Sequence, residues 1–158
     1  MDKTEDILIS LQQKYVCKML EGRKTVELRR RVLRVSSGTR VWIYSKSPHA
    51  VVEVLAVVDE VVSAPPKQLW QDYQDRLGVS ESEFSAYFVD VKLGCAVILK
   101  NVQRLRSGVS LTELRRHSAS FQPPQFFLRL QEGSPALRAL EGTSTVEIRP
   151  IPSPLASC

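Results

Sequence analysis

Three residues with the chemistry of an anion-binding or acid–base site stand in one short string, G-R-K-T-V-E-L-R, which spans residues 22–29. They are Lys24, Glu27 and Arg29. A lysine binds phosphate as a point charge, and it becomes a base or a nucleophile when burial lowers its pKa. The Glu27 carboxylate opposes the second role, because a neighbouring negative charge stabilises the ammonium form. The alternative is a simple surface ion pair, which contributes less than about 1 kcal/mol.

The pattern around the string predicts how it is held. Residues 14–21 have the apolar spacing of a helix, and Gly22 suits the left-handed position that ends one. A strand predicted over residues 25–32 then alternates its side chains between two faces, and Lys24 at its start reaches over the polar face. The polar face carries Thr25, Glu27, Arg29 and Arg31, and the core face carries Val26, Leu28 and Val32.

Positive charge is concentrated around the same string. The chain has a net charge of +5, but residues 14–46 alone hold ten Lys and Arg residues against Glu21 and Glu27. A concentrated basic region attracts phosphate, whereas a charge run is otherwise most often a solvated face. Because this run surrounds Lys24, we interpret it as part of a phosphate-binding surface.

A second polar segment precedes Pro48 at the end of another predicted strand, and it consists of Tyr44, Ser45, Lys46 and Ser47. We expect it to form a loop. Its hydroxyls and backbone N–H groups suit a phosphate or the edge of a base. An ordinary turn, in which the serines bond their own backbone, explains the same residues equally well.

Aromatic side chains offer stacking surfaces for bases, worth about 1–3 kcal/mol per base in proteins that bind single strands. Trp42 and Trp70 lie among apolar neighbours, so burial in the core is the favoured interpretation for both. After a proline pair, Phe126 or Phe127 is expected to seal one end of the fold. The alternative is that Gln125 and Phe126 form a lid over the site.

The remaining pattern predicts an α+β chain in which strands dominate. Its 158 residues suffice for one domain with a sizeable core. Further strands are expected over residues 7–11, 39–45, 50–62 and 94–105, with an edge strand over 145–151. Short helices are expected after Pro65-Pro66, Ser80 and Ser110. Helices inserted irregularly between strands favour a small, partly open, mixed β-barrel over a doubly wound sheet.

Composition argues against several classes of protein. No run approaches the roughly 18 apolar residues of a membrane span, and the charged N-terminus is unlike a signal peptide. Three widely spaced cysteines without a CxxC pair, and only two histidines, argue against a zinc site. We therefore expect no metal, no cofactor and no membrane partner, and a reducing cytoplasmic location.

The string also resembles the G-x-K-x-x-E-x-R signature of the ASCH domain, a PUA-like β-barrel, and every fixed position of the signature is filled. The resemblance extends to neighbouring segments in the same order. These are residues 7–11, 15–22, 41–48, 69–70 and 123–125. It implies an ASCH domain over residues 5–130 and a C-terminal extension, partly disordered, over residues 131–158.

The family implies two kinds of hydrolase. One branch removes the acetyl group of N4-acetylcytidine, using a lysine at the position of Lys24 and a threonine where this chain has Glu27. Thr25 is the candidate to take the place of that threonine within this chain. Another branch resembles a metal-independent ribonuclease in which the signature lysine acts with a tyrosine and a serine. The local candidates for these partners are Tyr15, Tyr44, Ser45 and Ser47.

The leading hypothesis is an RNA- or nucleotide-binding ASCH protein with a basic cleft built on the signature. Its expected nucleic-acid contacts are Lys24, Arg29, Arg31, Tyr44, Ser45, Lys46 and Ser47. The alternative is a small hydrolase, an N4-acetylcytidine amidohydrolase or a ribonuclease, with Lys24, Glu27 and Thr25 as catalytic residues. A third hypothesis is a regulatory module that binds proteins through the helices around residues 70–88. The sequence leaves open whether the partner is RNA or a modified nucleoside.

Overall fold

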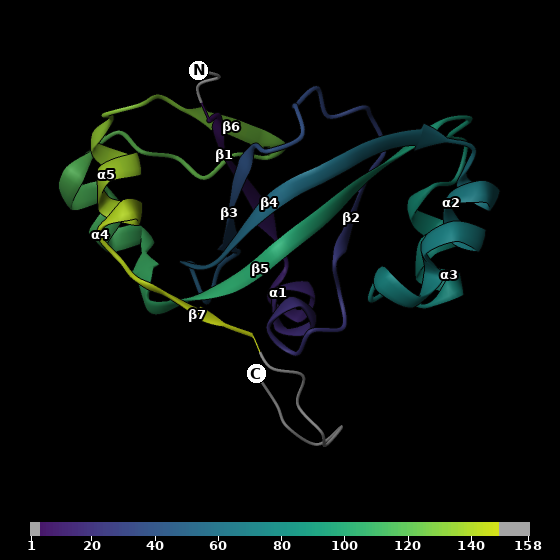
Figure 1. Cartoon of the computed structure of the whole chain (residues 1–158), viewed down its shortest axis with the longest axis horizontal. Coiled ribbons are helices and arrows are strands. Elements are labelled where there is room, and N and C mark those ends of the chain that lie inside the picture. The colour runs from purple at the N-terminus through teal and green to yellow at the C-terminus, as the bar shows by residue number, and fades with distance from the viewer. Residues whose placement is uncertain (1–3, 149–158) are drawn as a thin grey trace.

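One mixed sheet of seven strands forms the centre of the structure (Figure 1), a computed structural model that describes residues 4–148. The strands are β1 (Asp6–Leu11), β2 (Val26–Arg29), β3 (Arg40–Ser45), β4 (Val51–Ala64), β5 (Gly94–Ser110), β6 (Phe127–Leu130) and β7 (Thr145–Glu147). Their order is β2-β5-β4-β3-β1-β6, and β7 pairs with β5. β1 and β3 pair in parallel, and the other pairs are antiparallel.

Two long strands, β4 and β5, connect the ends of the molecule (Figure 1). The first half of β4, Val51–Val58, alternates buried and half-buried residues, as expected for a sheet with one face in the core. The β4–β5 pairing shifts register at three places. Such bulges bend a strand and increase its twist, which lets one strand pair contribute to all parts of the core.

Helices cover the sheet at separate places. They are α1 (Gln13–Leu20), α2 (Pro66–Tyr73), the 3₁₀ turn η1 (Gln74–Arg76), α3 (Glu81–Tyr87), α4 (Leu111–His117) and α5 (Pro135–Glu141). Figure 1 shows α2 and α3 at one end of the long strands and α4 and α5 at the other. The helix predicted after Ser80 is confirmed, and a capping box begins it: the Ser80 hydroxyl accepts the Glu83 N–H, and the Glu83 carboxylate accepts the Ser80 N–H.

The core is divided into three clusters that match this arrangement. The first packs α1 through Val16 and Met19 onto the middle of the sheet. The second gathers α4 and α5 around Trp42. The third packs α2 and α3 through Leu69 and Phe84 onto the far ends of β2, β4 and β5. Each helical end of the molecule therefore has its own apolar support.

The mixed α+β class is confirmed, but closure of the sheet into a barrel is not. The strand order is an open path that begins with β2 and ends with β6, and these two edge strands do not pair in the described part of the chain. The Arg29 side chain crosses the gap, since its Nη1 donates to the Phe126 carbonyl at 3.2 Å.

Several sequence predictions need correction. β2 ends at Arg29, so Val32 lies beyond the strand and is 51% exposed rather than in the core. α5 was not predicted, although Leu137 and Leu140 are buried in the second core cluster. It lies in the segment assigned to a C-terminal extension. The predicted edge strand is confirmed over Thr145–Glu147, and its last residues, with the other residues from 149 to 158, lie outside the described residues.

No helix within residues 4–148 is long and apolar enough to cross a membrane.

Candidate functional site

A cavity of about 670 Å³ opens at the gap between the two edge strands. Its walls come from β1, α1, the β2 strand with the residues after it, α3, and the segment that leads into β6. Half of the ten basic residues in the charged region reach it. These are Lys24, Arg29, Arg30, Arg31 and Lys46. Two carboxylates, Glu27 and Glu83, share the lining, so the wall is basic overall, as an anion-binding site requires.

Lys24 is buried deep in this wall, with only 2% of its surface exposed. Its ammonium donates to the Val26 and Leu77 carbonyls, both at 2.8 Å, and lies 3.5 Å from Glu27 Oε1. Burial lowers the pKa of Lys24, while Glu27 partly offsets that effect. The sequence predicted a lysine that reaches over a surface, and the third core cluster instead encloses it.

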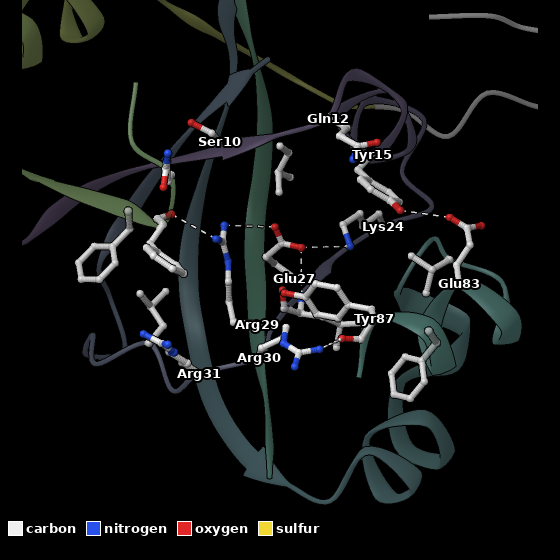
Figure 2. Close-up of a pocket in the computed structure, with 18 of the residues that line it drawn as sticks. Ser10, Gln12, Tyr15, Lys24, Glu27, Arg29, Arg30, Arg31, Glu83 and Tyr87 are labelled. Carbon is white, nitrogen blue, oxygen red and sulfur yellow. Dashed lines mark hydrogen bonds and ion pairs between the residues drawn. The ribbon is translucent and has the colours of Figure 1, made fainter. Parts of the chain in front are cut away.

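Glu27 is the centre of the polar row that Figure 2 shows between Lys24 and Arg29. Its side chain is also buried, at 6% exposure. Oε1 accepts the Leu28 N–H at 3.0 Å, and Oε2 lies 3.5 Å from Arg29 Nη2. Both ion-pair distances are long for charge-assisted hydrogen bonds, which lie near 2.7–2.9 Å. The carboxylate therefore retains capacity to accept a further hydrogen bond from a ligand.

Arg29 extends from the end of β2 across the gap in the sheet. Its Nε atom is buried and without a hydrogen-bond partner in the described part of the chain. A buried N–H donor without a partner destabilises the folded protein, and an acceptor that binds it removes this cost. Arg29 is thus held by Glu27 and Phe126 in a position where it still has a donor to offer.

Two tyrosines that were not singled out for the nucleic-acid contacts also line the cavity. Tyr15 donates to Glu83 at 3.1 Å, and its ring centroid lies 5.6 Å from the Lys24 ammonium. Tyr87 donates to the Leu28 carbonyl at 3.2 Å. Burial raises the pKa of Tyr87, and the Glu27 charge adds to that effect. Of the tyrosines considered as partners of Lys24, Tyr15 is the one that the fold brings beside it.

Ser10 is a further cavity residue that sequence reasoning missed. It lies on β1, is 5% exposed, and its Oγ is buried without a hydrogen-bond partner among the described residues. Nothing in the strand pattern separates it from its apolar neighbours except the hydroxyl itself. A polar residue in a fully buried strand, DILISL, was the one available signal.

The structure separates the other predicted contacts from the cavity. Thr25 precedes β2, and its hydroxyl accepts a hydrogen bond from Arg76 Nε at 2.8 Å, outside the cavity lining. Tyr44 and Ser45 belong to β3 rather than to a loop, and both are buried. Ser45 lies 3.2 Å from His49 Nδ1. Tyr44 and Ser47 instead line a second hollow next to the cavity.

The aromatic predictions are partly confirmed. Trp42 is buried and donates to Asp6 Oδ1 at 3.0 Å. Trp70 packs against the third cluster. Phe127 packs against the first cluster, whereas Phe126 is 60% exposed at the mouth of the cavity, with the Arg31 guanidinium 5.8 Å from its ring centroid. Phe126 thus presents a free ring face beside a cation.

Within residues 4–148, no group of three or more His, Cys, Asp or Glu side chains is placed to hold a metal ion. The groups that the cavity offers are an amine, guanidinium groups, a carboxylate and hydroxyls, which suit anion binding and proton transfer.

Comparison with known proteins assigns the family. A family described as a domain of unknown function (DUF365) matches residues 5–127. A protein of Zymomonas mobilis subsp. mobilis named ASCH domain-containing ribonuclease is 31% identical over 121 residues, covering 77% of this chain and 81% of the relative.

Solved structures agree. The crystal structure of ASCH from Zymomonas mobilis superimposes with a TM-score of 0.82 at 30% identity, covering 90% of this chain and 98% of the other. A variant of the same protein with a tyrosine replaced by phenylalanine gives 0.81 at 29% identity, with coverages of 88% and 99%. The N-terminal domain of Staphylothermus marinus McrB, at 11% identity and a TM-score of 0.55, shares the fold alone. The chain therefore belongs to the ASCH domain family.

Proposed function

We propose that this protein binds RNA in the cavity built on Lys24, Glu27 and Arg29. The observation that carries the proposal is the row of buried charges beside an open cavity: the Glu27 carboxylate and the Arg29 guanidinium are both fixed, and both retain unused hydrogen-bonding capacity. The Zymomonas relative, named a ribonuclease, supports RNA as the class of ligand.

Each cavity group then has a role. Arg29 pairs with a phosphate, because a guanidinium matches that group in charge and geometry. Glu27 accepts a hydrogen bond from the amine of a base, which discriminates among bases. Phe126, exposed beside Arg31, stacks a base at the mouth of the cavity. Arg31 and Lys46 follow the backbone of the RNA.

The test is the affinity of the purified protein for a short mixed-sequence RNA, measured by fluorescence anisotropy over a range of salt concentrations. We expect Arg29→Gln to weaken binding about tenfold, equivalent to about 1.4 kcal/mol. It should also reduce the slope of log K against log salt by about 0.7, the value for one phosphate contact in a single strand. Arg116→Gln, on α4 outside the cavity lining, is the matched control. An affinity that does not change with salt concentration contradicts the proposal. So does an equal loss of affinity in Arg29→Gln and Arg116→Gln.

A second candidate function is cleavage of the bound RNA. It is favoured by the lowered pKa of Lys24, since a neutral amine can take a proton, and by the position of the Tyr15 ring beside that amine. The N4-acetylcytidine amidohydrolase hypothesis has less support, because Thr25 lies outside the cavity lining.

Cleavage is tested by incubating RNA with the wild type, Lys24→Met and Tyr15→Phe, and by following fragments on a gel. The control is Lys67→Met, an exposed lysine on α2. We expect Lys24→Met to lose at least about 100-fold in rate, the lower range for a general acid or base. Circular dichroism shows whether each variant is folded. If RNA stays intact with the wild type, or if Lys24→Met and Lys67→Met cleave at equal rates, cleavage by Lys24 is refuted and RNA binding remains the proposed function.

A further inference from the structure

The cavity is not isolated. A second hollow of about 580 Å³ adjoins it, lined by Ser10, Tyr44, Lys46, Ser47, Pro123, Pro124 and Gln125. Three of these residues, Ser10, Lys46 and Gln125, line both spaces. Tyr44 and Ser47, which the fold separates from the cavity, therefore face a space that continues from it.

The three shared residues have one chemical property in common. A serine hydroxyl, a lysine ammonium and a glutamine amide are all hydrogen-bond donors. Among the described residues, the second hollow has no carboxylate in its lining, so nothing acidic opposes an anion there. The junction between the two spaces is thus a place for an anion, flanked on each side by room for something larger.

Ser10 gives the strongest reason to place a ligand at the junction. Its hydroxyl is buried on β1 and unpartnered within the described part of the chain, although buried hydroxyls nearly always have a partner. Leaving such a group unsatisfied costs free energy in the empty protein. A ligand atom that accepts its hydrogen would recover that free energy.

We propose that the ligand is a polynucleotide that fills both hollows, with one nucleotide in the cavity and the next in the second hollow. The phosphodiester between them is held at the junction by Ser10, Lys46 and Gln125. This inference rests on the proposed function and deepens it, because it selects a polymer over a single nucleoside. Tyr44, Ser47 and the Pro123-Pro124 pair then contact the second nucleotide.

The experiment compares three ligands for each of the four bases: the mononucleotide, the dinucleotide, and the dinucleotide with an uncharged methylphosphonate linkage. A 2′-fluoro sugar at the first position prevents cleavage. Calorimetry should show that the best dinucleotide binds the wild type about tenfold tighter than its mononucleotide. The methylphosphonate should lose most of this gain, because it lacks the charge that strengthens the hydrogen bonds at the junction.

Ser10→Ala and Lys46→Ala should each weaken binding of the dinucleotide about threefold or more, and should weaken binding of the methylphosphonate clearly less. The matched controls are Ser37→Ala and Lys67→Ala, exposed positions outside both linings. Ser10→Ala should also be at least as stable as the wild type in thermal unfolding, since it removes an unsatisfied hydroxyl and no hydrogen bond.

The outcomes separate this inference from the proposed function. Equal binding of mononucleotide and dinucleotide overturns the two-nucleotide arrangement and leaves RNA binding in the cavity intact. Equal binding of the two linkages overturns the position of the phosphate. A Ser10→Ala protein that is clearly less stable shows that the hydroxyl serves the fold, which overturns its role here. No binding of any ligand refutes the proposed function, and this inference with it.

Discussion

Two buried carboxylates, Glu27 and Asp6, lie in different parts of the sheet and are held in different ways. Asp6 on β1 accepts a hydrogen bond from the Trp42 indole N–H at 3.0 Å and forms an ion pair with Arg40 at 2.6 Å. Arg40 also pairs with Glu141 at 3.0 Å. Glu27 is paired at 3.5 Å on both sides. The ion-pair distances around Asp6 are short, whereas those around Glu27 are long, and Glu27 borders a cavity.

The difference follows from what surrounds each carboxylate. Asp6 ties β1 and β3 to α5, and the second core cluster, with Trp42 at its centre, packs beside it. Glu27 lies on β2, an edge strand that pairs on one side only among residues 4–148. Removing one partner of a buried charge pair with short contacts destabilises the fold strongly, whereas a buried carboxylate with unused capacity beside a cavity is available to a ligand.

The largest expected effect is on stability, and it belongs to Asp6. Asp6→Asn should lower the free energy of unfolding by about 3–5 kcal/mol, the range for breaking a buried ion pair. Glu27→Gln should cost clearly less, because its ion pairs are long and Lys24 keeps two carbonyl acceptors. Urea unfolding monitored by tryptophan fluorescence measures both. Equal losses in the free energy of unfolding for Asp6→Asn and Glu27→Gln would show that the two carboxylates do not differ in their role in stability.

The reverse order is expected for RNA affinity. Glu27→Gln should change the preference for one base by about tenfold, because an amide offers a donor where the carboxylate only accepts. Asp6→Asn, measured on protein that is still folded, should leave affinity unchanged. Anisotropy titrations with four homopolymeric oligonucleotides provide the measurement. If only Asp6→Asn lost affinity, the RNA would bind near Asp6 and not near Glu27.

A smaller effect comes from the pH dependence of Lys24. Burial lowers its pKa from the ordinary value of 10.5. Between the lowered value and 10.5 the unfolded chain binds more protons than the folded one, so this residue makes stability rise with pH in that window. The free energy of unfolding should therefore rise with pH in the wild type relative to Lys24→Met. Parallel pH profiles for the two proteins would show that Lys24 stays charged.

The smallest effect is at Glu83, which links Lys14 and Tyr15 on α1 to α3. Hydrogen bonds from Ser80, Lys14 and Tyr15 lower its pKa to about 2 from 4.5. Its contribution to stability is therefore complete above pH 4.5 and disappears as the pH falls from 4.5 to about 2. Glu83→Gln should reduce stability slightly at pH 6, and the difference should vanish in acid. Glu81→Gln, on the same helix, is the control. A difference that persists at pH 2 would show that the effect does not come from the charge of Glu83.

Much of the site was accessible from sequence because its signals are local. Glu27 and Arg29 share one face of β2 through strand alternation, and the Ser80 capping box follows from helix geometry. Ser10 and Tyr87 were missed as cavity residues, since they come from β1 and α3, distant in the sequence from the signature. No local pattern reports which residues of separate elements will share one cavity.

The sequence by itself determined the family, the mixed α+β class, the position of most strands and helices, and the charges gathered around residues 22–29. Tertiary structure decided that β2 and β6 do not pair with each other in the described part of the chain, and that Ser10 faces the space between these two strands. It also decided that Lys24 is buried rather than exposed. The physical reason is that periodicity acts over a few residues. Burial, pKa and hydrogen-bond satisfaction depend on which distant segments pack together.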